Sequence, residues 1–317
     1  MKEVKIVFMG TASFSRCVLE KLLENNFNII GVVTQPDRYV GRKKILTMPE
    51  VKEVAIEHAI PVYQPQRIKK DYQEIIDLKP DLIITAAYGQ IVPEEILKTP
   101  KLGCINVHAS LLPKYRGGAP VHYAIINGEK VTGVSIMYMA KKMDAGNIIS
   151  QAKVNIGDQE TTGELYERLS IIGAELLIET LPSIIEGNNT SIKQDELLVT
   201  YAPTISHEQE KLDFDKSALQ VYNQVRGMNP WPGAYTIYQD KVIKIWAGKI
   251  HECENAKKHH SHQENGTIVK IFKDAIGVKT GDGIYLITEL QVAGKKRMLV
   301  KDYLNGNSIF NVDTKFE

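Results

Sequence analysis

The chain has 317 residues, which is enough for two domains that each bury a core of their own. Hydrophobic residues make up 43% and charged residues 24%, as in an ordinary soluble globular enzyme. The net charge of +1 excludes a protein that attracts polyanions through its overall field, so any contact with nucleic acid must use local patches and shape.

The cysteines and the apolar runs bear on the cellular compartment. Cys17, Cys104 and Cys253 are scattered and odd in number, which favours a reducing compartment over a disulfide framework. The first apolar run is too short for a secretory signal, and no run approaches the ~18 apolar residues of a membrane span. We therefore expect a cytoplasmic protein without a membrane partner, and we expect it to be a monomer.

Short apolar runs alternate with amphipathic segments through the first part of the chain. This alternation predicts a Rossmann-like α/β domain in which helices cover both faces of a parallel sheet. Only one glycine, Gly10, follows the first strand where a dinucleotide site needs G-x-G-x-x-G, so no nicotinamide cofactor is expected. Strands are predicted at 4–9, 28–34, 61–63, 81–86 and 132–139, and helices at 14–23, 49–58, 71–78, 119–127 and 162–185.

Two connections in this domain are candidates for function. Residues 35–48 (Q-P-D-R-Y-V-G-R-K-K-I-L-T-M) are predicted to form a long basic loop. Such a loop is either functional or a solvated surface in which Lys43 and Lys44 serve solubility. Residues 86–93 (A-A-Y-G-Q-I-V-P) form the turn after a strand, and they either line a site or pack against the domain through Tyr88 and Ile91.

The chain is organised around residues 103–120, which read G-C-I-N-V-H-A-S-L-L-P-K-Y-R-G-G-A-P. The first part predicts a buried strand in which Asn106 and His108, two residues apart, share one face. S-L-L-P ends the strand, and K-Y-R-G-G-A-P predicts a flexible, basic loop. An open α/β sheet binds its ligand where such strands end, but a polar pair bonded to nearby backbone is an equal alternative at this point.

A carboxylate follows at Asp144, in the turn predicted for 141–149 (K-K-M-D-A-G-N-I-I). An Asp before Ala-Gly is most often a turn former, so the residue alone does not indicate catalysis. The domain is predicted to end at 189 and to be followed by a polar, extended linker at 190–207.

Residues 208–317 predict a second domain. A helix is expected at 218–228, a rigid N-P-W-P turn lies at 229–232, and short strands are expected at 234–238, 242–246, 267–272, 275–279 and 284–289. Such a pattern is typical of a small OB-like β-barrel, a fold that commonly holds nucleic acid. The K-K-H-H-S-H tract at 257–262 is interpreted as an exposed loop, and no metal site is expected.

The string N-V-H-A-S-L-L-P-x-x-R-G-G-A-P at 106–120 closely resembles the signature of the folate-dependent formyltransferases. N-P-W-P, T-G-D-G-I at 280–284 and A-G-K-K-R-M at 293–298 resemble the carboxyl-terminal domain of the members that act on methionyl-tRNA. The resemblance therefore covers nearly the whole chain. It implies that a formyl group passes from 10-formyltetrahydrofolate, as co-substrate, to the amino group of initiator methionyl-tRNA.

The resemblance also implies roles for individual residues. The catalytic set would be Asn106, His108 and Asp144. The folate side would be shaped by Ser110, Leu111, Leu112 and Pro113, together with Gln90, Ile91 and Val92, and the acceptor end of tRNA would be bound by Arg42, Lys43 and Lys44. In the expected chemistry, the amide and the imidazole stabilise an oxyanion, and the imidazole or the carboxylate moves a proton.

The sequence departs from the family pattern in a few turns. G-T-A-S-F stands where G-T-P-x-F is usual, Tyr39 follows Q-P-D-R in place of a proline, M-P-E stands at 48–50 where P-x-P is expected, and Val292 replaces another proline. Three other interpretations stay open. They are a formyltransferase for a nucleotide sugar or glycinamide ribonucleotide, a formyltetrahydrofolate hydrolase, and an idle RNA- or folate-binding protein.

Overall fold

A computed structural model describes residues 3–41, 43–251 and 262–317. The predictions made for Arg42, Cys253 and 257–261 lie outside the described residues. The chain divides into two compact units, each described here by itself. Unit 1 comprises Met1–Pro120, Val131–Asn155 and Tyr166–Pro203, and unit 2 comprises Val121–Lys130, Ile156–Leu165 and Thr204–Glu317.

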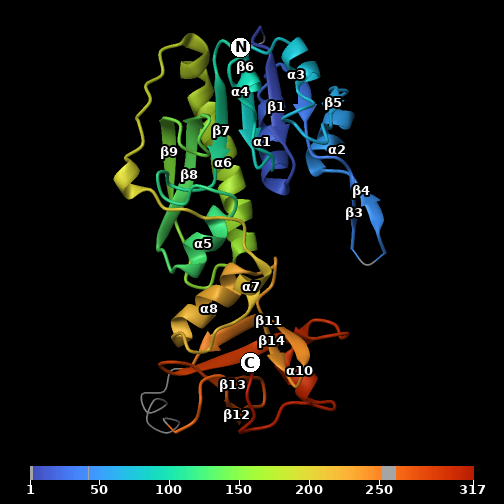
Figure 1. Ribbon diagram of the computed structural model, residues 1–317, viewed down its shortest axis with the longest axis vertical. Helices are drawn as coiled ribbons and strands as arrows, with labels where there is room; N and C mark the ends of the chain where they lie inside the picture. Colours follow the sequence, from blue (N-terminus) through green and yellow to red (C-terminus); the bar gives the residue numbers. More distant parts are fainter. Residues whose placement is uncertain (1–2, 42, 252–261) are drawn as a thin grey trace. The chain divides into compact units, whose positions relative to one another are not determined.

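Unit 1 is built on one seven-stranded sheet (Figure 1), with the strand order β5-β2-β1-β6-β7-β8-β9. The first five strands of this order run parallel, and the last two are antiparallel to their neighbours. The expectation of a Rossmann-like sheet is confirmed. The strands are β1 (Ile6–Gly10), β2 (Ile29–Val33), β5 (Val62–Tyr63), β6 (Leu82–Ala86), β7 (Cys104–His108), β8 (Val131–Tyr138) and β9 (Ile148–Asn155).

Helices pack on both faces of this sheet because alternate strand residues point to opposite sides and are mostly apolar on both. On one side, Val7 and Met9 of β1 share a buried cluster with Ile75 and Ile96. On the other side, Gly173 lies against Val107 and Phe14, where a methyl group would come within 3.0 Å and 3.4 Å of them. The helices of unit 1 are α1 (Ser13–Glu24), α2 (Glu50–Glu57), α3 (Gln73–Asp77), α4 (Glu94–Leu97) and, from Tyr166 onward, α6 (Thr162–Glu186).

The basic connection at 35–48 is not a loop throughout, and this part of the prediction is wrong. It contains a hairpin of β3 (Arg38–Val40) and β4 (Ile45–Thr47), which projects from unit 1 in Figure 1. The side chains of both strands are exposed, so the hairpin has no buried face that would give the alternating pattern of a sheet strand.

Unit 2 contains a curled antiparallel sheet that is consistent with the predicted OB-like fold. Its strand order is β10-β11-β14-β13-β12, and β15 pairs with β14. The irregular register between β11 and β14 near Ala247 bends the sheet. The strands are β10 (Tyr235–Tyr238), β11 (Lys241–Ile250), β12 (Ile268–Ile271), β13 (Ile276–Lys279), β14 (Ile284–Val292) and β15 (Met298–Leu299).

An aromatic cluster fills the core of unit 2. The ring centroid of Tyr238 lies 5.0 Å from that of Phe310 and 5.2 Å from that of Phe316, distances typical of favourable aromatic pairs. Val221 and Val225 of one helix join this core. Within the described residues, the helices of unit 2 are α5 (Pro120–Ile126, from Val121 onward), α7 (His207–Glu210), α8 (Ala218–Gly227) and α10 (Val300–Leu304), while η1 (Glu196–Leu198) lies in unit 1.

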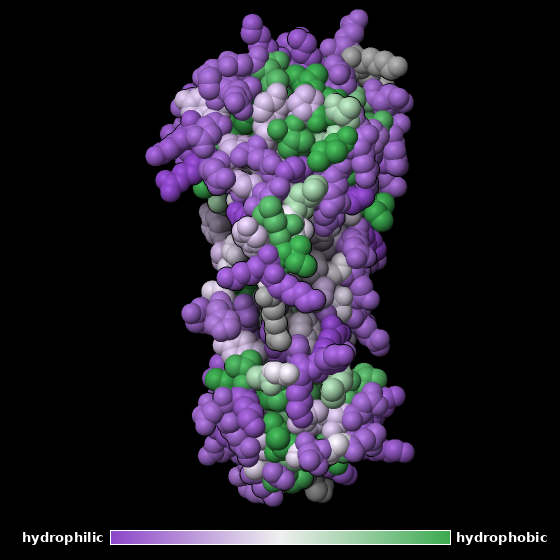
Figure 2. Space-filling view, turned by 90° about the vertical axis from the view of Figure 1, so that its right-hand side faces the viewer, coloured by the Kyte–Doolittle hydropathy of each residue, from purple (hydrophilic) through white to green (hydrophobic). Residues whose placement is uncertain are grey.

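One face of the molecule is mostly polar (Figure 2). On the face that Figure 2 shows, hydrophilic side chains predominate and apolar ones form small groups. Across the described ranges of the chain, no helix combines the length and the apolar character needed to cross a lipid bilayer.

Candidate active site

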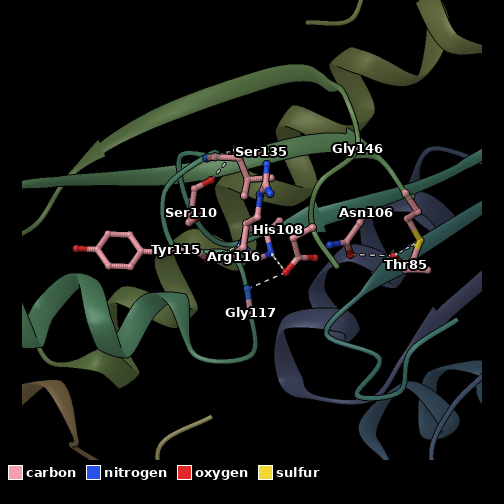
Figure 3. A network of polar contacts seen from close by, with 12 residues as sticks. Thr85, Asn106, His108, Ser110, Tyr115, Arg116, Gly117, Ser135 and Gly146 are labelled. Atoms are coloured by element: carbon pink, nitrogen blue, oxygen red, sulfur yellow. Dashed lines mark hydrogen bonds and ion pairs between the residues drawn. The ribbon is translucent and has the colours of Figure 1, made fainter. Parts of the chain in front are cut away.

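Strand β7 places Asn106 and His108 at the carboxyl end of the unit 1 sheet, two residues apart as predicted. The hydroxyl of Thr85 on neighbouring β6 donates to Asn106 Oδ1 over 2.8 Å. In this arrangement the amide oxygen faces the hydroxyl, whose other acceptors, the Ile105 carbonyl and the Met139 sulfur, both lie at 3.2 Å. In Figure 3 the Asn106 nitrogen consequently points away from Thr85, to the side of His108. The side chain therefore presents a hydrogen-bond donor.

His108 is 6% exposed, and one of its ring nitrogens is already engaged. Nε2 lies 3.1 Å from the backbone carbonyl oxygen of Tyr115. A carbonyl oxygen only accepts hydrogen bonds, so Nε2 carries the hydrogen. The other nitrogen, Nδ1, is then the atom of His108 that can take up or release a proton.

Asp144 faces that second nitrogen. One of its carboxylate oxygens, Oδ2, lies 3.9 Å from His108 Nδ1. This distance is too long for a direct hydrogen bond, but it lets the two largely buried groups attract each other whenever the imidazole carries a positive charge. The end of strand β7 and a turn beyond β8 thus bring an imidazole and a carboxylate together.

The backbone of Gly117 holds the same carboxylate oxygen. Its N–H donates to Asp144 Oδ2 over 2.8 Å (Figure 3). Gly117 has φ +127°, and a Cβ there would lie 2.5 Å from the carbonyl oxygen of Ala202. Only glycine fits this position without a shift of the backbone. Gly117, the first glycine of R-G-G-A-P, is therefore required by this backbone geometry.

The turn that follows β7 is held by internal hydrogen bonds. Ser110 is fully buried, and its hydroxyl donates to the carbonyl of Lys114 over 2.7 Å. Ser135 accepts from the N–H of Leu112 and donates to the carbonyl of Ser110. These contacts fix the shape of the S-L-L-P turn. A folate-binding role for Ser110, Leu111, Leu112 and Pro113 stays a prediction.

The other predicted folate segment, Gln90 to Val92, follows β6. Because β6 and β7 are parallel neighbours, with Ala86 opposite Val107, the turns that follow them leave the same edge of the sheet. The Gln90 amide accepts from the N–H of Ile68, Ile91 is 52% exposed, and Val92 is buried. Of these, Ile91 offers an apolar surface. Its contact with folate stays a prediction.

The K-Y-R-G-G-A-P segment is not a flexible, basic loop, and this interpretation is wrong at Arg116. The Arg116 side chain is 1% exposed. It donates to Gln194 Oε1 through Nε and Nη2, over 3.0 Å and 2.8 Å, and to Glu196 over 2.9 Å. Sequence reasoning missed Gln194 and Glu196. They lie 78 and 80 residues beyond Arg116 in a polar segment with no motif.

This ion pair predicts a specific dependence of stability on pH. Arg116 and Lys142 lower the pKa of the exposed Glu196 carboxyl from 4.5 to about 2. A carboxyl whose pKa is lowered by folding stabilises the protein above its unfolded pKa and loses that effect as the pH falls toward its folded pKa. We therefore expect Glu196→Gln to lower the urea midpoint at pH 7, and the difference from the parent to shrink below pH 4.5. An equal difference at pH 7 and pH 3 would contradict this assignment.

The predicted tRNA-binding residues lie at the tip of the β3–β4 hairpin. Lys43 and Lys44 are exposed, and Lys44 has φ +47°, while Arg42 lies outside the described residues. Exposed apolar side chains accompany them, since Tyr39 is 71% exposed and pairs across the hairpin with Leu46. The hairpin therefore offers cationic and apolar groups together. Its function stays a prediction.

Comparison with known proteins covers both units. Residues 4–181 match the family model described as formyl transferase, and residues 204–308 match formyl transferase, C-terminal domain. A methionyl-tRNA formyltransferase of Bacillus subtilis (strain 168) is 51% identical over 305 residues, which span 95% of this chain and 94% of the relative. Its counterpart in Bacillus thuringiensis (strain Al Hakam) is 53% identical over 307 residues, 96% of each chain.

A solved structure supports the fold. The N-formyltransferase from Helicobacter canadensis, in complex with folinic acid and dTDP-3-aminofucose, superposes with a TM-score of 0.69. The match covers 93% of this chain and 100% of that chain, at 22% sequence identity. At this level of identity the similarity concerns the fold alone.

Proposed function

The chain belongs to the methionyl-tRNA formyltransferases, and from this premise we propose that it transfers the formyl group of 10-formyltetrahydrofolate to the amino group of methionyl-initiator tRNA. One observation carries the proposal for the site. His108 Nδ1 and Asp144 Oδ2 lie 3.9 Å apart. Asn106, on the same strand as His108, has its amide oxygen hydrogen-bonded to the Thr85 hydroxyl.

We propose that Asn106 stabilises the tetrahedral intermediate. The methionyl amine adds to the formyl carbon, the carbonyl oxygen becomes an oxyanion, and the bond from that carbon to N10 of the folate then breaks. A donor aimed at the oxyanion lowers this barrier by ~3–4 kcal/mol. Because Thr85 occupies the amide oxygen, the NH₂ group of Asn106 is the part that faces the substrates.

We assign the proton transfers of the reaction to His108 and Asp144. One proton must leave the attacking amine, and one must reach N10 as the folate departs. Nδ1 is the exchangeable atom of His108, since Nε2 donates to the Tyr115 carbonyl. The Asp144 carboxylate lies 3.9 Å from Nδ1, close enough to compensate positive charge that develops on the ring during the reaction. His108 then hydrogen-bonds the oxyanion or relays the proton, and Asp144 keeps the positive charge compensated.

We propose that the two turns after β6 and β7 bind the folate. They leave one edge of the sheet, which is where an open α/β sheet binds ligands. A pterin needs apolar walls together with backbone donors and acceptors. Ile91 offers the apolar surface, and the bonded S-L-L-P turn offers a backbone fixed by Ser110 and Ser135.

We propose that the β3–β4 hairpin binds the acceptor end of the tRNA through Arg42, Lys43 and Lys44. Replacing Lys43 and Lys44 by Ala is expected to raise the KM for methionyl-tRNA and to leave kcat at saturating tRNA within about twofold. Each lost lysine–phosphate contact should lower the slope of log KM against log salt by about 1, so the pair should lower it by about 2. Steady-state kinetics between 50 and 300 mM KCl measure this slope.

Lys69 and Lys70 provide the matched control. They are also adjacent, exposed lysines of unit 1. Replacing them by Ala removes the same charge and should leave the KM and its salt slope near the parent values. If both double variants change the salt slope equally, the tRNA contact is a general charge effect, and the assignment of the hairpin is wrong.

The function is tested by formyl transfer from 10-formyltetrahydrofolate to charged initiator tRNA. We expect N-formylmethionyl-tRNA as product, with much slower transfer to elongator methionyl-tRNA and none to dTDP-amino sugars. Release of formate without acceptor would indicate a hydrolase, and transfer to the sugar amine would indicate a sugar enzyme. Binding of either substrate without turnover would indicate a binding protein.

We further propose the organisation that the sequence predicts. Residues 1–189 would form the catalytic domain, 190–207 the linker, and 208–317 the β-barrel domain that binds tRNA. We propose a monomer that works in the cytoplasm, where charged tRNA and folate are available. Analytical ultracentrifugation at micromolar concentration tests the monomeric state.

A further inference from the structure

Residues 190–203 form a segment that packs within unit 1 beside the proposed catalytic carboxylate. Ile192 exchanges two backbone hydrogen bonds with Ile148, of 2.9 Å and 2.8 Å. Further along, the carbonyl of Thr200 accepts from the N–H of Arg116, and the N–H of Ala202 donates to the Arg116 carbonyl. Both ends of the segment are therefore fixed, and Gln194 lies between them.

Gln194 is 4% exposed and uses all parts of its amide. Its Nε2 donates to the backbone carbonyl of Asp144 over 2.8 Å and to that of Gly146 over 2.7 Å. Its oxygen accepts the two bonds from Arg116. Arginine only donates and the two carbonyls only accept, so the amide has a single orientation that satisfies every partner.

The turn that Gln194 holds is one that the chain does not adopt readily. Asp144 has φ +51°, in the left-handed region that residues with a side chain rarely occupy. Gly146 lies so close to Tyr138 that a Cβ would come within 1.7 Å of its carbonyl oxygen. Such a conformation persists only when the surroundings fix it. Gln194 bonds the carbonyls on both sides of Ala145 and so fixes it.

From this geometry we infer that Gln194, oriented by Arg116, is a positioning residue that sets the place of the Asp144 carboxylate relative to His108. The inference rests on the proposed function only in that Asp144 takes part in the reaction. Gln194 touches the backbone of Asp144, not its carboxylate. Its influence on the reaction would pass through the 3.9 Å separation between Asp144 Oδ2 and His108 Nδ1.

Gln194→Met tests the inference, because it keeps the length of the side chain and removes the amide. A displacement of about 1 Å in a catalytic group lowers rates by up to ~100-fold. We expect kcat to fall by about 10- to 50-fold, with the KM for the folate within about twofold of the parent. Gln194→Glu keeps an oxygen for Arg116 and removes the two donors to the turn, so it should lower kcat similarly.

Gln224→Met is the matched control. Gln224 is also buried, and its Nε2 donates to two backbone carbonyls, those of Gln209 and Lys211, within unit 2. The substitution removes two amide-to-carbonyl bonds like those of Gln194, far along the chain from Asp144, but no bond to the amide oxygen, which in Gln194 accepts from Arg116. It should lower the melting temperature, by less than Gln194→Met does, while leaving kcat within about twofold.

A double-mutant cycle of Gln194→Met with Asp144→Asn distinguishes a positioning role of Gln194 from a general loss of stability. If Gln194 acts through Asp144, Gln194→Met should lower kcat less than about threefold in the Asp144→Asn background, measured in single turnover. An undiminished loss in that background would overturn the inference, as would parental kcat in folded Gln194→Met. If neither Gln194 variant folds at 20 °C, its role is structural and the inference is also wrong. If the parent protein does not formylate methionyl-tRNA, the proposed function is wrong. The inference about Gln194 is then tested by the same cycle with whichever amine the protein does formylate.

Discussion

Asp144→Asn is expected to lower kcat by at least ~100-fold while the protein stays folded. The amide oxygen of the asparagine can still accept from Gly117, so the turn keeps its hydrogen bond. What is lost is the negative charge 3.9 Å from His108 Nδ1. Without that charge the imidazolium form has no compensation, and the proton is transferred less readily. Single-turnover formyl transfer, with circular dichroism as the check on folding, measures the effect.

His108 provides the partner experiment. His108→Ala should lower kcat by a similar factor of at least ~100. If both side chains serve one proton transfer, as we propose, the double variant should lose little beyond either single variant. Losses that multiply fully would show that the two groups act independently. A folded Asp144→Asn enzyme with a near-parental rate would remove the carboxylate from the mechanism.

The fold could be predicted wherever buried positions leave a recognisable run or stripe of apolar residues in the sequence. Strands such as β1 and β6 are buried along their whole length, so they appear as short apolar runs. The long helix α6 shows an apolar stripe and was predicted within one residue of its end. The hairpin at 38–47 was missed, because three-residue strands exposed on both faces leave no pattern. The edge strand β9 was missed because only one of its eight residues is buried.

The site was predictable to the extent that one strand carries it. Asn106 and His108 share a face by the two-residue period of a strand, and the resemblance of their surroundings added Asp144. Gln194 had no such signal, since its contacts lie 48 to 78 residues away in sequence and arise only from tertiary packing. Arg116 was misread for the same reason. A basic residue before two glycines suggests exposure unless its buried partners are known.

Asn106→Ala is expected to lower kcat by at least ~100-fold, with the KM for both substrates little changed. The NH₂ group acts on an oxyanion that exists only in the transition state and the intermediate. Its loss should therefore appear in kcat and in kcat/KM equally. A single donor of this kind contributes ~3–4 kcal/mol, which matches the expected factor. Asn106→Asp should not restore activity, because a carboxylate of the same shape accepts hydrogen bonds and repels the oxyanion.

Thr85→Val tests whether the orientation of that amide matters. The valine keeps the shape of the side chain and removes the hydroxyl that donates to Asn106 Oδ1. The amide then loses the contact that turns its nitrogen to the side of His108, so kcat should fall by about tenfold, less than in Asn106→Ala. In the Asn106→Ala background the same substitution should have almost no further effect on kcat. A full tenfold loss there would mean that Thr85 acts on the reaction by a route other than Asn106, and the oxyanion role assigned to the amide would lose its structural basis.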